Sequence, residues 1–151
     1  MLSLNKQSEL DQEMLGKCLS LSLSKNCVIH LYGELGTGKT TLVRGILRGF
    51  NYLGAVKSPT YTLIEPYYLD QVTVLHLDLY RIQAPEELDY LGLEDFAQNE
   101  AVWLIEWPER GGNRLPVADL NIYISYQNLG RRLIFDIRNH HIGDIGTIIY
   151  C

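Results

Sequence analysis

Apolar and polar positions follow two different rhythms along this chain. In two stretches the apolar side chains recur every three or four positions, which is the spacing of an amphipathic helix. Elsewhere they run unbroken or alternate one by one, which indicates buried or half-buried strands. The pattern predicts helices over residues 8–23 and 39–50 and another beginning at Pro85, with Gly92 ending or interrupting it. It predicts strands over residues 27–32, 72–80, 101–105, 120–126 and 132–138.

The first predicted helix has a capping residue and a candidate core face. Ser8 is placed to cap it, because a serine hydroxyl accepts a hydrogen bond from a free amide of the first turn. The face that we expect to be buried consists of Leu10, Met14, Leu15, Cys18, Leu19 and Leu21. Residues 61–68 fit a short strand or an extended segment broken by Pro66. Residues 139–151 carry no usable pattern, and we expect a divergent tail there.

The order of these elements predicts an α/β fold. Helices alternate with apolar strands early in the chain, and a β-rich section closes it, which indicates a mostly parallel central sheet with an antiparallel C-terminal extension. The chain has 151 residues and is 46% hydrophobic. This is enough for a sizeable core, so we expect residues 1–151 to form a single domain.

Composition excludes several classes of protein. The chain has no apolar run of 18 residues and no signal-like N-terminus, so we expect no membrane span and a cytoplasmic location. Its cysteines (Cys18, Cys27 and Cys151) are odd in number and scattered, which suggests buried or incidental thiols in a reducing compartment. The net charge of −5 argues against direct binding of nucleic acid, which requires clustered positive charge.

The strongest motif is the run from Gly33 to Thr40, which fits G-x-x-x-x-G-K-[ST], the phosphate-binding P-loop. The amides of residues 36–38 can form a nest for anionic oxygens. Lys39 can approach the β and γ phosphates, and the Thr40 hydroxyl is a hard oxygen ligand suited to Mg²⁺. A predicted strand precedes the run and a predicted helix follows it, as the motif requires. The chain is therefore expected to adopt a P-loop NTPase-like, three-layer fold.

Two acids are candidates for the metal end of such a site. Asp78 lies late in one predicted strand, and Glu106 directly follows another. Ligands of open α/β sheets bind at the carboxyl ends of the strands. The sequence by itself does not choose between the two acids as the direct metal ligand.

Other nearby residues allow two interpretations each. The segment 58–62, which includes Thr60, can be a phosphate-sensing loop or a plain turn. Trp107 can pack on a base or ribose, or belong to the core. His30 and His76 fit satisfied core histidines. The D-x-x-G match at residues 89–92 falls in a predicted helix rather than after a strand, and no guanine-reading N-K-x-D follows the P-loop, which favours adenine as the base.

Four blocks of sequence, taken together, resemble the TsaE family (also called YjeE), the small bacterial ATPase of tRNA threonylcarbamoyladenosine biosynthesis. The blocks are residues 33–41, 57–63 (KSPTYTL), 76–81 (HLDLYR) and 105–109 (IEWPE). The likeness extends from about residue 8 to residue 138, and nothing is carried over to the tail.

The resemblance implies ATP and Mg²⁺ as cofactors. It implies catalytic roles for Lys39, Thr40, Asp78 and Glu106, with Thr40 and Glu106 as the metal ligands and Asp78 near the metal-bound water. The residues that it implies around the nucleotide are Glu9, Leu35, Gly36, Thr37, Gly38, Lys39, Thr40, Thr60, Trp107, Glu109 and Arg131.

The resemblance also implies partners. It predicts an ATPase, slow alone and stimulated by partners, that is required for modification of adenosine 37 in tRNAs reading ANN codons. It would act with TsaD and TsaB, reach tRNA only through that complex and bind no membrane. Two alternatives stay open: a non-hydrolytic, nucleotide-dependent binding switch, and a small-molecule P-loop kinase, although no Arg-rich lid segment is visible.

Overall fold

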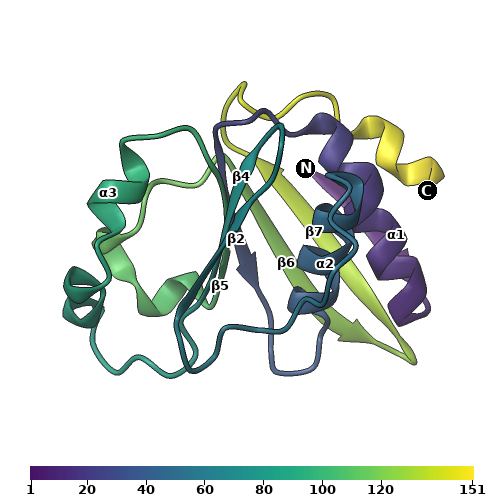
Figure 1. Ribbon diagram of the computed structural model, residues 1–151. Helices are drawn as coiled ribbons and strands as arrows, with labels where there is room; N and C mark the ends of the chain where they lie inside the picture. The colour runs from purple at the N-terminus through teal and green to yellow at the C-terminus, as the bar shows by residue number, and fades with distance from the viewer.

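The computed structural model (Figure 1) describes residues 1–151 apart from the side chain of Ile149. Seven strands form one sheet in the order β1-β7-β6-β2-β5-β4-β3. The strands are β1 (Leu2–Lys6), β2 (Cys27–Tyr32), β3 (Ile64–Tyr68), β4 (Thr73–Asp78), β5 (Val102–Glu106), β6 (Leu120–Gln127) and β7 (Gly130–Ile137). The α-helices are α1 (Glu9–Leu19), α2 (Lys39–Gly49) and α3 (Leu93–Ala97). No helix in the described part of the chain is long and apolar enough to cross a bilayer.

The middle of the sheet is parallel and its margins are antiparallel. Strands β6, β2, β5 and β4 are parallel neighbours, whereas β7, β1 and β3 pair antiparallel with theirs. This confirms the predicted α/β fold and its antiparallel C-terminal extension. Strand β1 was not predicted, because its five residues carry little local signal and its partner β7 lies far along the chain.

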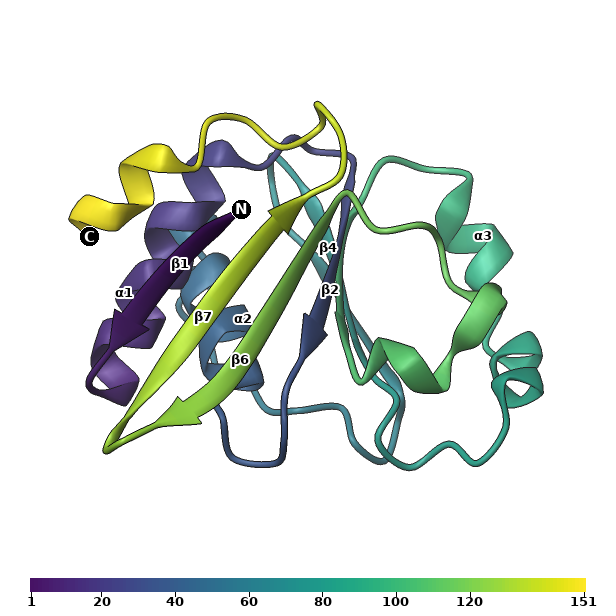
Figure 2. The same cartoon turned by 180° about the vertical axis from the view of Figure 1, so that it is seen from behind.

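The sheet lies between two layers (Figures 1 and 2). Helices α1 and α2 and the C-terminal segment cover one face, and α3 with the 3₁₀ turns between residues 85 and 114 covers the other. Strand β4 contributes side chains to the cores on both faces of the sheet, because successive side chains of a strand point to opposite faces. Val74 packs in the α1–α2 core, whereas Leu75, Leu77 and Leu79 pack in the other. The alternation predicted for residues 72–80 is thereby confirmed.

Local details also follow from backbone chemistry. Pro66 lies within β3 and does not break it, because β3 is an edge strand and a proline there need not donate to the ladder. A 3₁₀ helix begins at Pro85 and ends at Tyr90, and Gly92 has a φ of +68° before α3 begins. The predicted interruption at Gly92 is therefore confirmed.

The predicted first helix is only partly correct. Ser8 caps α1 by accepting a hydrogen bond from the amide of Asp11 at 3.1 Å, as expected. However, α1 ends at Leu19 and continues as a 3₁₀ turn over Ser20–Ser22. Leu15 and Leu19 are buried, but three members of the predicted face are exposed: Leu10, Met14 and Leu21. The buried stripe instead runs through Gln12, Leu15, Gly16 and Leu19, because α2 packs against that side.

A close crossing of α1 and α2 determines this face. A Cβ atom on Gly16 would meet the Leu42 carbonyl oxygen, and one on Gly45 would meet the Glu13 carbonyl oxygen. The backbones approach closely only because both positions lack a side chain.

We expect Gly45→Ala to lower the melting temperature, although alanine is the better helix former by about 1 kcal/mol. The added methyl group has no space at the crossing, and overpacking of this kind costs about 1–3 kcal/mol. Thermal unfolding measures the effect, and Gly143→Ala is the control, since its Cβ would lie 3.3 Å from the Ser22 carbonyl oxygen, a tight contact that a shift of a few tenths of an ångström relieves. A raised melting temperature for Gly45→Ala would contradict the close crossing.

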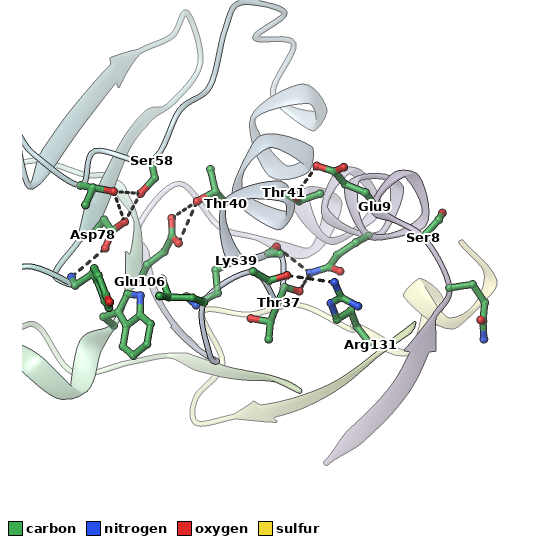
Figure 3. A pocket seen from close by; sticks show the side chains of 18 of the residues that line it. Ser8, Glu9, Thr37, Lys39, Thr40, Thr41, Ser58, Asp78, Glu106 and Arg131 are labelled. Atoms are coloured by element: carbon green, nitrogen blue, oxygen red, sulfur yellow. Dashed lines mark hydrogen bonds between the residues drawn. The ribbon is translucent and has the colours of Figure 1, made fainter. Parts of the chain in front are cut away.

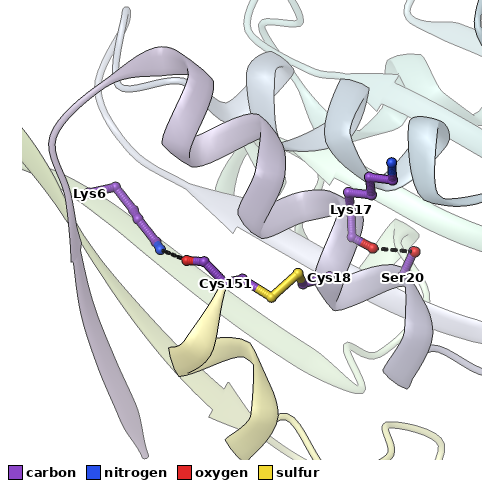
Figure 4. Close-up of a disulfide and its surroundings, with 5 residues drawn as sticks. All are labelled: Lys6, Lys17, Cys18, Ser20 and Cys151. Carbon is purple, nitrogen blue, oxygen red and sulfur yellow. Dashed lines mark hydrogen bonds between the residues drawn. A yellow bond between two sulfur atoms is a disulfide. The ribbon is translucent and has the colours of Figure 1, made fainter.

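The segment 139–151 is packed rather than loose. Ile142, Ile145 and Ile148 are buried in the α1–α2 core. The Lys6 ammonium donates to the carbonyl of Cys151 at 2.7 Å, and a disulfide joins Cys151 to Cys18 of α1 (Figure 4). The expectation that all the cysteines are thiols is therefore wrong for this pair, because the fold brings together two positions that are 133 residues apart in sequence.

Cys27 is a buried free thiol, as expected. Burial, with the nearby charge of Asp119, raises the pKa of Cys27 to about 12. At pH 8 this thiol therefore stays protonated and poorly reactive.

We expect a thiol-reactive dye at pH 8 to label no cysteine rapidly in the native protein, one after unfolding and three after unfolding with reduction. Reductant should lower the melting temperature of the wild type, because opening so long a loop costs about 2–4 kcal/mol. It should leave that of Cys151→Ser unchanged. Two or more labelled thiols in the unreduced, unfolded protein would contradict the disulfide.

Candidate functional site

A cavity of about 590 Å³ opens at the carboxyl ends of β2, β5 and β4. This size suits a small-molecule ligand. The predicted residues that line it are Glu9, Leu35, Gly36, Thr37, Gly38, Lys39, Thr40, Thr60, Asp78, Glu106, Trp107 and Arg131, and most of their side chains appear in Figure 3. Glu109 lies in the 3₁₀ turn Pro108–Arg110 and does not line the cavity, so its contact with the nucleotide stays a prediction.

The loop between β2 and α2 forms the floor of the cavity. Gly36 and Gly38 have φ values of +78° and +97°, which other residues rarely adopt. Helix α2 begins at Lys39, and no side chain of the described residues caps its N-terminus. Free amides and the positive end of the helix dipole therefore face the cavity, an arrangement that suits phosphate.

Lys39 carries the positive charge of this floor. Its Nζ donates to the carbonyls of Gly33 at 2.5 Å and Glu34 at 2.9 Å, and it lies 4.6 Å from the ring centroid of Trp107. Burial lowers the pKa of Lys39 from its usual value, and the nearby carboxylates of Glu106 and Asp78 oppose that shift. Trp107 itself has a φ of +58°, a costly conformation for a bulky residue and one that marks functional segments.

The two predicted acids lie opposite each other. Asp78 and Glu106 are register partners at the ends of β4 and β5, and both are almost fully buried. The Thr40 hydroxyl donates to the Glu106 carboxylate, with Oγ1 at 2.9 and 3.1 Å from its two oxygens. Glu106 is thus the acid in contact with the P-loop threonine. Thr40 and Glu106 offer the hard oxygen ligands that Mg²⁺ prefers.

Asp78 makes different contacts. It accepts hydrogen bonds from the hydroxyls of Ser58 and Thr60, the latter at 3.2 Å, and from the amide of Tyr80 at 3.0 Å. The segment around Thr60 is therefore attached to an acid of the site and lines the cavity, rather than forming a detached turn. Whether Thr60 contacts a phosphate stays a prediction.

The far end of the cavity is formed by α1 and the β6–β7 hairpin. The Arg131 guanidinium donates to the Gly36 carbonyl at 3.2 Å and lies 4.4 Å from the ring of Tyr126. Tyr126 in turn donates to the Leu35 carbonyl at 2.7 Å. Glu9, which is exposed, accepts hydrogen bonds from Thr41 and Arg44, each at 3.2 Å. These contacts keep both chain segments close to the P-loop.

Sequence reasoning missed two polar residues that support the site. Gln12 of α1 is buried, and its Nε2 donates to the carbonyls of Thr37 at 3.0 Å and Gly38 at 2.8 Å. His76 is buried in the core, as expected, and its Nε2 lies 2.5 Å from Oε2 of Glu106, but its Nδ1 has no hydrogen-bond partner among the described residues. The available signal was the same for both: a polar residue at a buried position of an otherwise apolar face.

Comparisons with known proteins identify the family of this chain. The family model described as "Threonylcarbamoyl adenosine biosynthesis protein TsaE" matches residues 6–134. The chain belongs to the TsaE family. Its relatives include proteins named "tRNA threonylcarbamoyladenosine biosynthesis protein TsaE" from Haemophilus influenzae and Rickettsia conorii. The first is 44% identical over 76% of this chain and 73% of its own length, and the second is 36% identical over 88% and 76%.

A solved structure shows the same fold. The crystal structure of Bacillus subtilis YdiB has a TM-score of 0.78 with this chain at 25% sequence identity, covering 93% of this chain and 88% of the other. The match to the TsaE family model ends at residue 134, within β7, so the packed segment 139–151 lies outside the matched residues.

We expect Gln12→Ala to loosen the P-loop without unfolding α1. The substitution leaves the carbonyls of Thr37 and Gly38 without their side-chain donor. Amide hydrogen exchange of Thr37 and Leu42, whose N–H groups donate to the carbonyls of Glu34 and Gly38, should therefore become about tenfold faster, which corresponds to roughly 1.4 kcal/mol. Met14→Ala, on the exposed side of the same helix, is the control and should leave the exchange unchanged. Equal exchange in the two variants would show that Gln12 does not support the loop.

Proposed function

We propose that this protein is a Mg²⁺-dependent ATPase that acts in threonylcarbamoyladenosine modification of adenosine 37 in tRNAs reading ANN codons. The observation that carries the proposal is the contact between Thr40 and Glu106 at the mouth of the P-loop. It brings a P-loop hydroxyl and a buried carboxylate together where a metal held by phosphate oxygens would need them. Membership of the TsaE family supports the pathway.

Each element of the cavity then has a task. The amides of residues 36–38 and the N-terminus of α2 bind phosphate oxygens, and Lys39 neutralises their charge. Thr40 and Glu106 hold Mg²⁺, which supplies charge stabilisation for phosphoryl transfer to water. Asp78, with Ser58 and Thr60, orients the attacking water. Arg131, Glu9 and Trp107 border the remainder of the nucleotide.

We propose that the protein works with TsaD and TsaB and meets tRNA only through them. The net charge of −5 fits contact with proteins better than contact with RNA. A role in tRNA modification within this complex implies a cytoplasmic location, and the Cys18–Cys151 disulfide is then an exception to the reduced state usual for cytosolic cysteines. A partner that holds the segment around Thr60 in its active position would raise a slow basal rate of hydrolysis, since such segments govern hydrolysis in P-loop proteins.

A second candidate is a nucleotide-dependent binding switch that does not need hydrolysis. The observation favouring it is the attachment of Ser58 and Thr60 to Asp78, because a loop fastened to an acid of the site can report the state of the nucleotide to a partner.

The deciding experiment is ATP hydrolysis by the protein alone and with purified TsaD and TsaB. We expect a low basal rate that rises with the partners, and Glu106→Gln should lower the stimulated kcat about 100-fold, because it removes the charged ligand of the Mg²⁺ on which phosphoryl transfer depends. Glu65→Gln, the same chemical change on an exposed edge strand, is the control and should keep the wild-type rate.

Tight ATP binding with no hydrolysis in the full complex would favour the switch. The switch also predicts that Asp78→Asn, a variant that we expect to bind ATP without hydrolysing it, still supports tRNA modification in the reconstituted system. Loss of modification together with loss of hydrolysis would favour the ATPase.

A further inference from the structure

His76 is a fully buried imidazole in direct contact with an acid of the site. It lies in β4 with no exposed surface, and its Nε2 is 2.5 Å from Oε2 of Glu106. The proposed function gives this residue no task. Among the described residues, its Nδ1 is the buried side-chain atom that finds no hydrogen-bond partner.

The sheet register explains how the two side chains meet. His76 is paired with Leu104 of β5, and Asp78 is paired with Glu106. Because side chains alternate along a strand, His76 and Glu106 lie on the same face of the sheet. They belong to register pairs two positions apart, with the pair Leu77 and Ile105 between them. The imidazole spans that diagonal, so the contact is built into the sheet and does not depend on a mobile loop.

Retaining a histidine here has a cost. A buried polar atom without a partner destabilises a fold, because it gives up its hydrogen bonds to water and gains none in return. An apolar side chain of similar size would fit the surrounding core, in which Val74 and Leu104 are fully buried, without that cost. The Nε2–H group must therefore contribute something that an apolar residue cannot.

The carboxylate of Glu106 shows what that contribution is. The terminal torsion of a glutamate is broad and nearly two-fold, so a carboxylate that is held weakly can rotate. The Thr40 hydroxyl is within hydrogen-bond distance of both oxygens, at 2.9 and 3.1 Å, and so distinguishes poorly between them. His76 contacts Oε2 alone. It removes the equivalence of the two oxygens and fixes the plane of the carboxylate.

We propose that His76 is a positioning residue for Mg²⁺ binding: its Nε2–H holds the Glu106 carboxylate in the one orientation that serves the metal beside Thr40. The inference rests on the proposed function, because it assumes that Glu106 is a ligand of Mg²⁺. Hydrogen-bond partners of metal ligands orient them, and their loss lowers metal affinity or activity by about 10–100-fold.

The test measures ATP affinity with Mg²⁺ and with EDTA, and takes the ratio of the two dissociation constants as the metal effect. His76→Leu removes the donor, and His76→Gln keeps an N–H group at the position of Nε2. We expect His76→Leu to reduce the metal effect by about tenfold or more, with ATP binding in EDTA unchanged. His76→Gln should restore the metal effect to within about threefold of wild type.

Two further variants separate positioning from general loss of structure. Val74→Ala, a core truncation on the same face of β4, should lower the melting temperature and leave the metal effect unchanged. If His76→Leu does not fold, His76→Asn replaces it, since its amide stays polar but is too short to reach Glu106. The comparison of Asn with Gln then carries the same test.

The possible results separate the role of His76 from the proposed function on which that role rests. A metal effect that is present in the wild type and equal in the Leu or Asn variant would overturn the role of His76 alone. A wild type that binds ATP equally well with and without Mg²⁺ would overturn the role of His76 in Mg²⁺ binding, while the proposed ATPase would still stand or fall by the hydrolysis experiment. A reduced metal effect that glutamine restores would support both.

Discussion

The arrangement of this site depends on the parallel pairing of β2, β5 and β4. Parallel strands end at the same edge of a sheet, so the backbone pairing alone brings together the loop after β2 and the last residues of β5 and β4. The P-loop follows β2, Glu106 ends β5 and Asp78 ends β4. A shift of one residue in either pairing would turn an acid to the opposite face, into an apolar layer. The register therefore fixes the chemistry as firmly as it fixes the fold.

This arrangement buries charge, and the surrounding contacts compensate for it. Lys39, Asp78 and Glu106 are each less than one-tenth exposed. Unpaired charges at such depth are very costly, whereas charges that are hydrogen-bonded are tolerated. The partners come from several elements: P-loop carbonyls for Lys39, hydroxyls of the 58–60 segment for Asp78, and Thr40 with His76 for Glu106. The site is thus stable only when every one of these segments is in place.

The sequence could predict what is local and could not predict what depends on distant neighbours. The P-loop, the cap at Ser8 and the strands that end in Asp78 and Glu106 are specified by short patterns, and the structure has them. The prediction of the buried face of α1 was partly wrong. That face packs on α2 through a close contact at Gly16 and Gly45, and glycines give a much weaker apolar signal in the sequence than the exposed Leu10 and Met14. Gln12 was overlooked and the contact of His76 with Glu106 was not predicted, because a lone polar residue has no chemical signature until its partner is known.

The disulfide between Cys18 and Cys151 has a consequence for the chain before it folds. Strands β1 and β7 begin more than a hundred residues apart along the backbone, and the entropy lost in bringing them together rises with that separation. Through the sulfur bridge the covalent path between Lys6 and Arg131 falls to about thirty residues. In an oxidised, unfolded chain the most distant strand pair of the sheet therefore becomes a comparatively local one, and the search for the edge of the sheet is shortened before any secondary structure has formed.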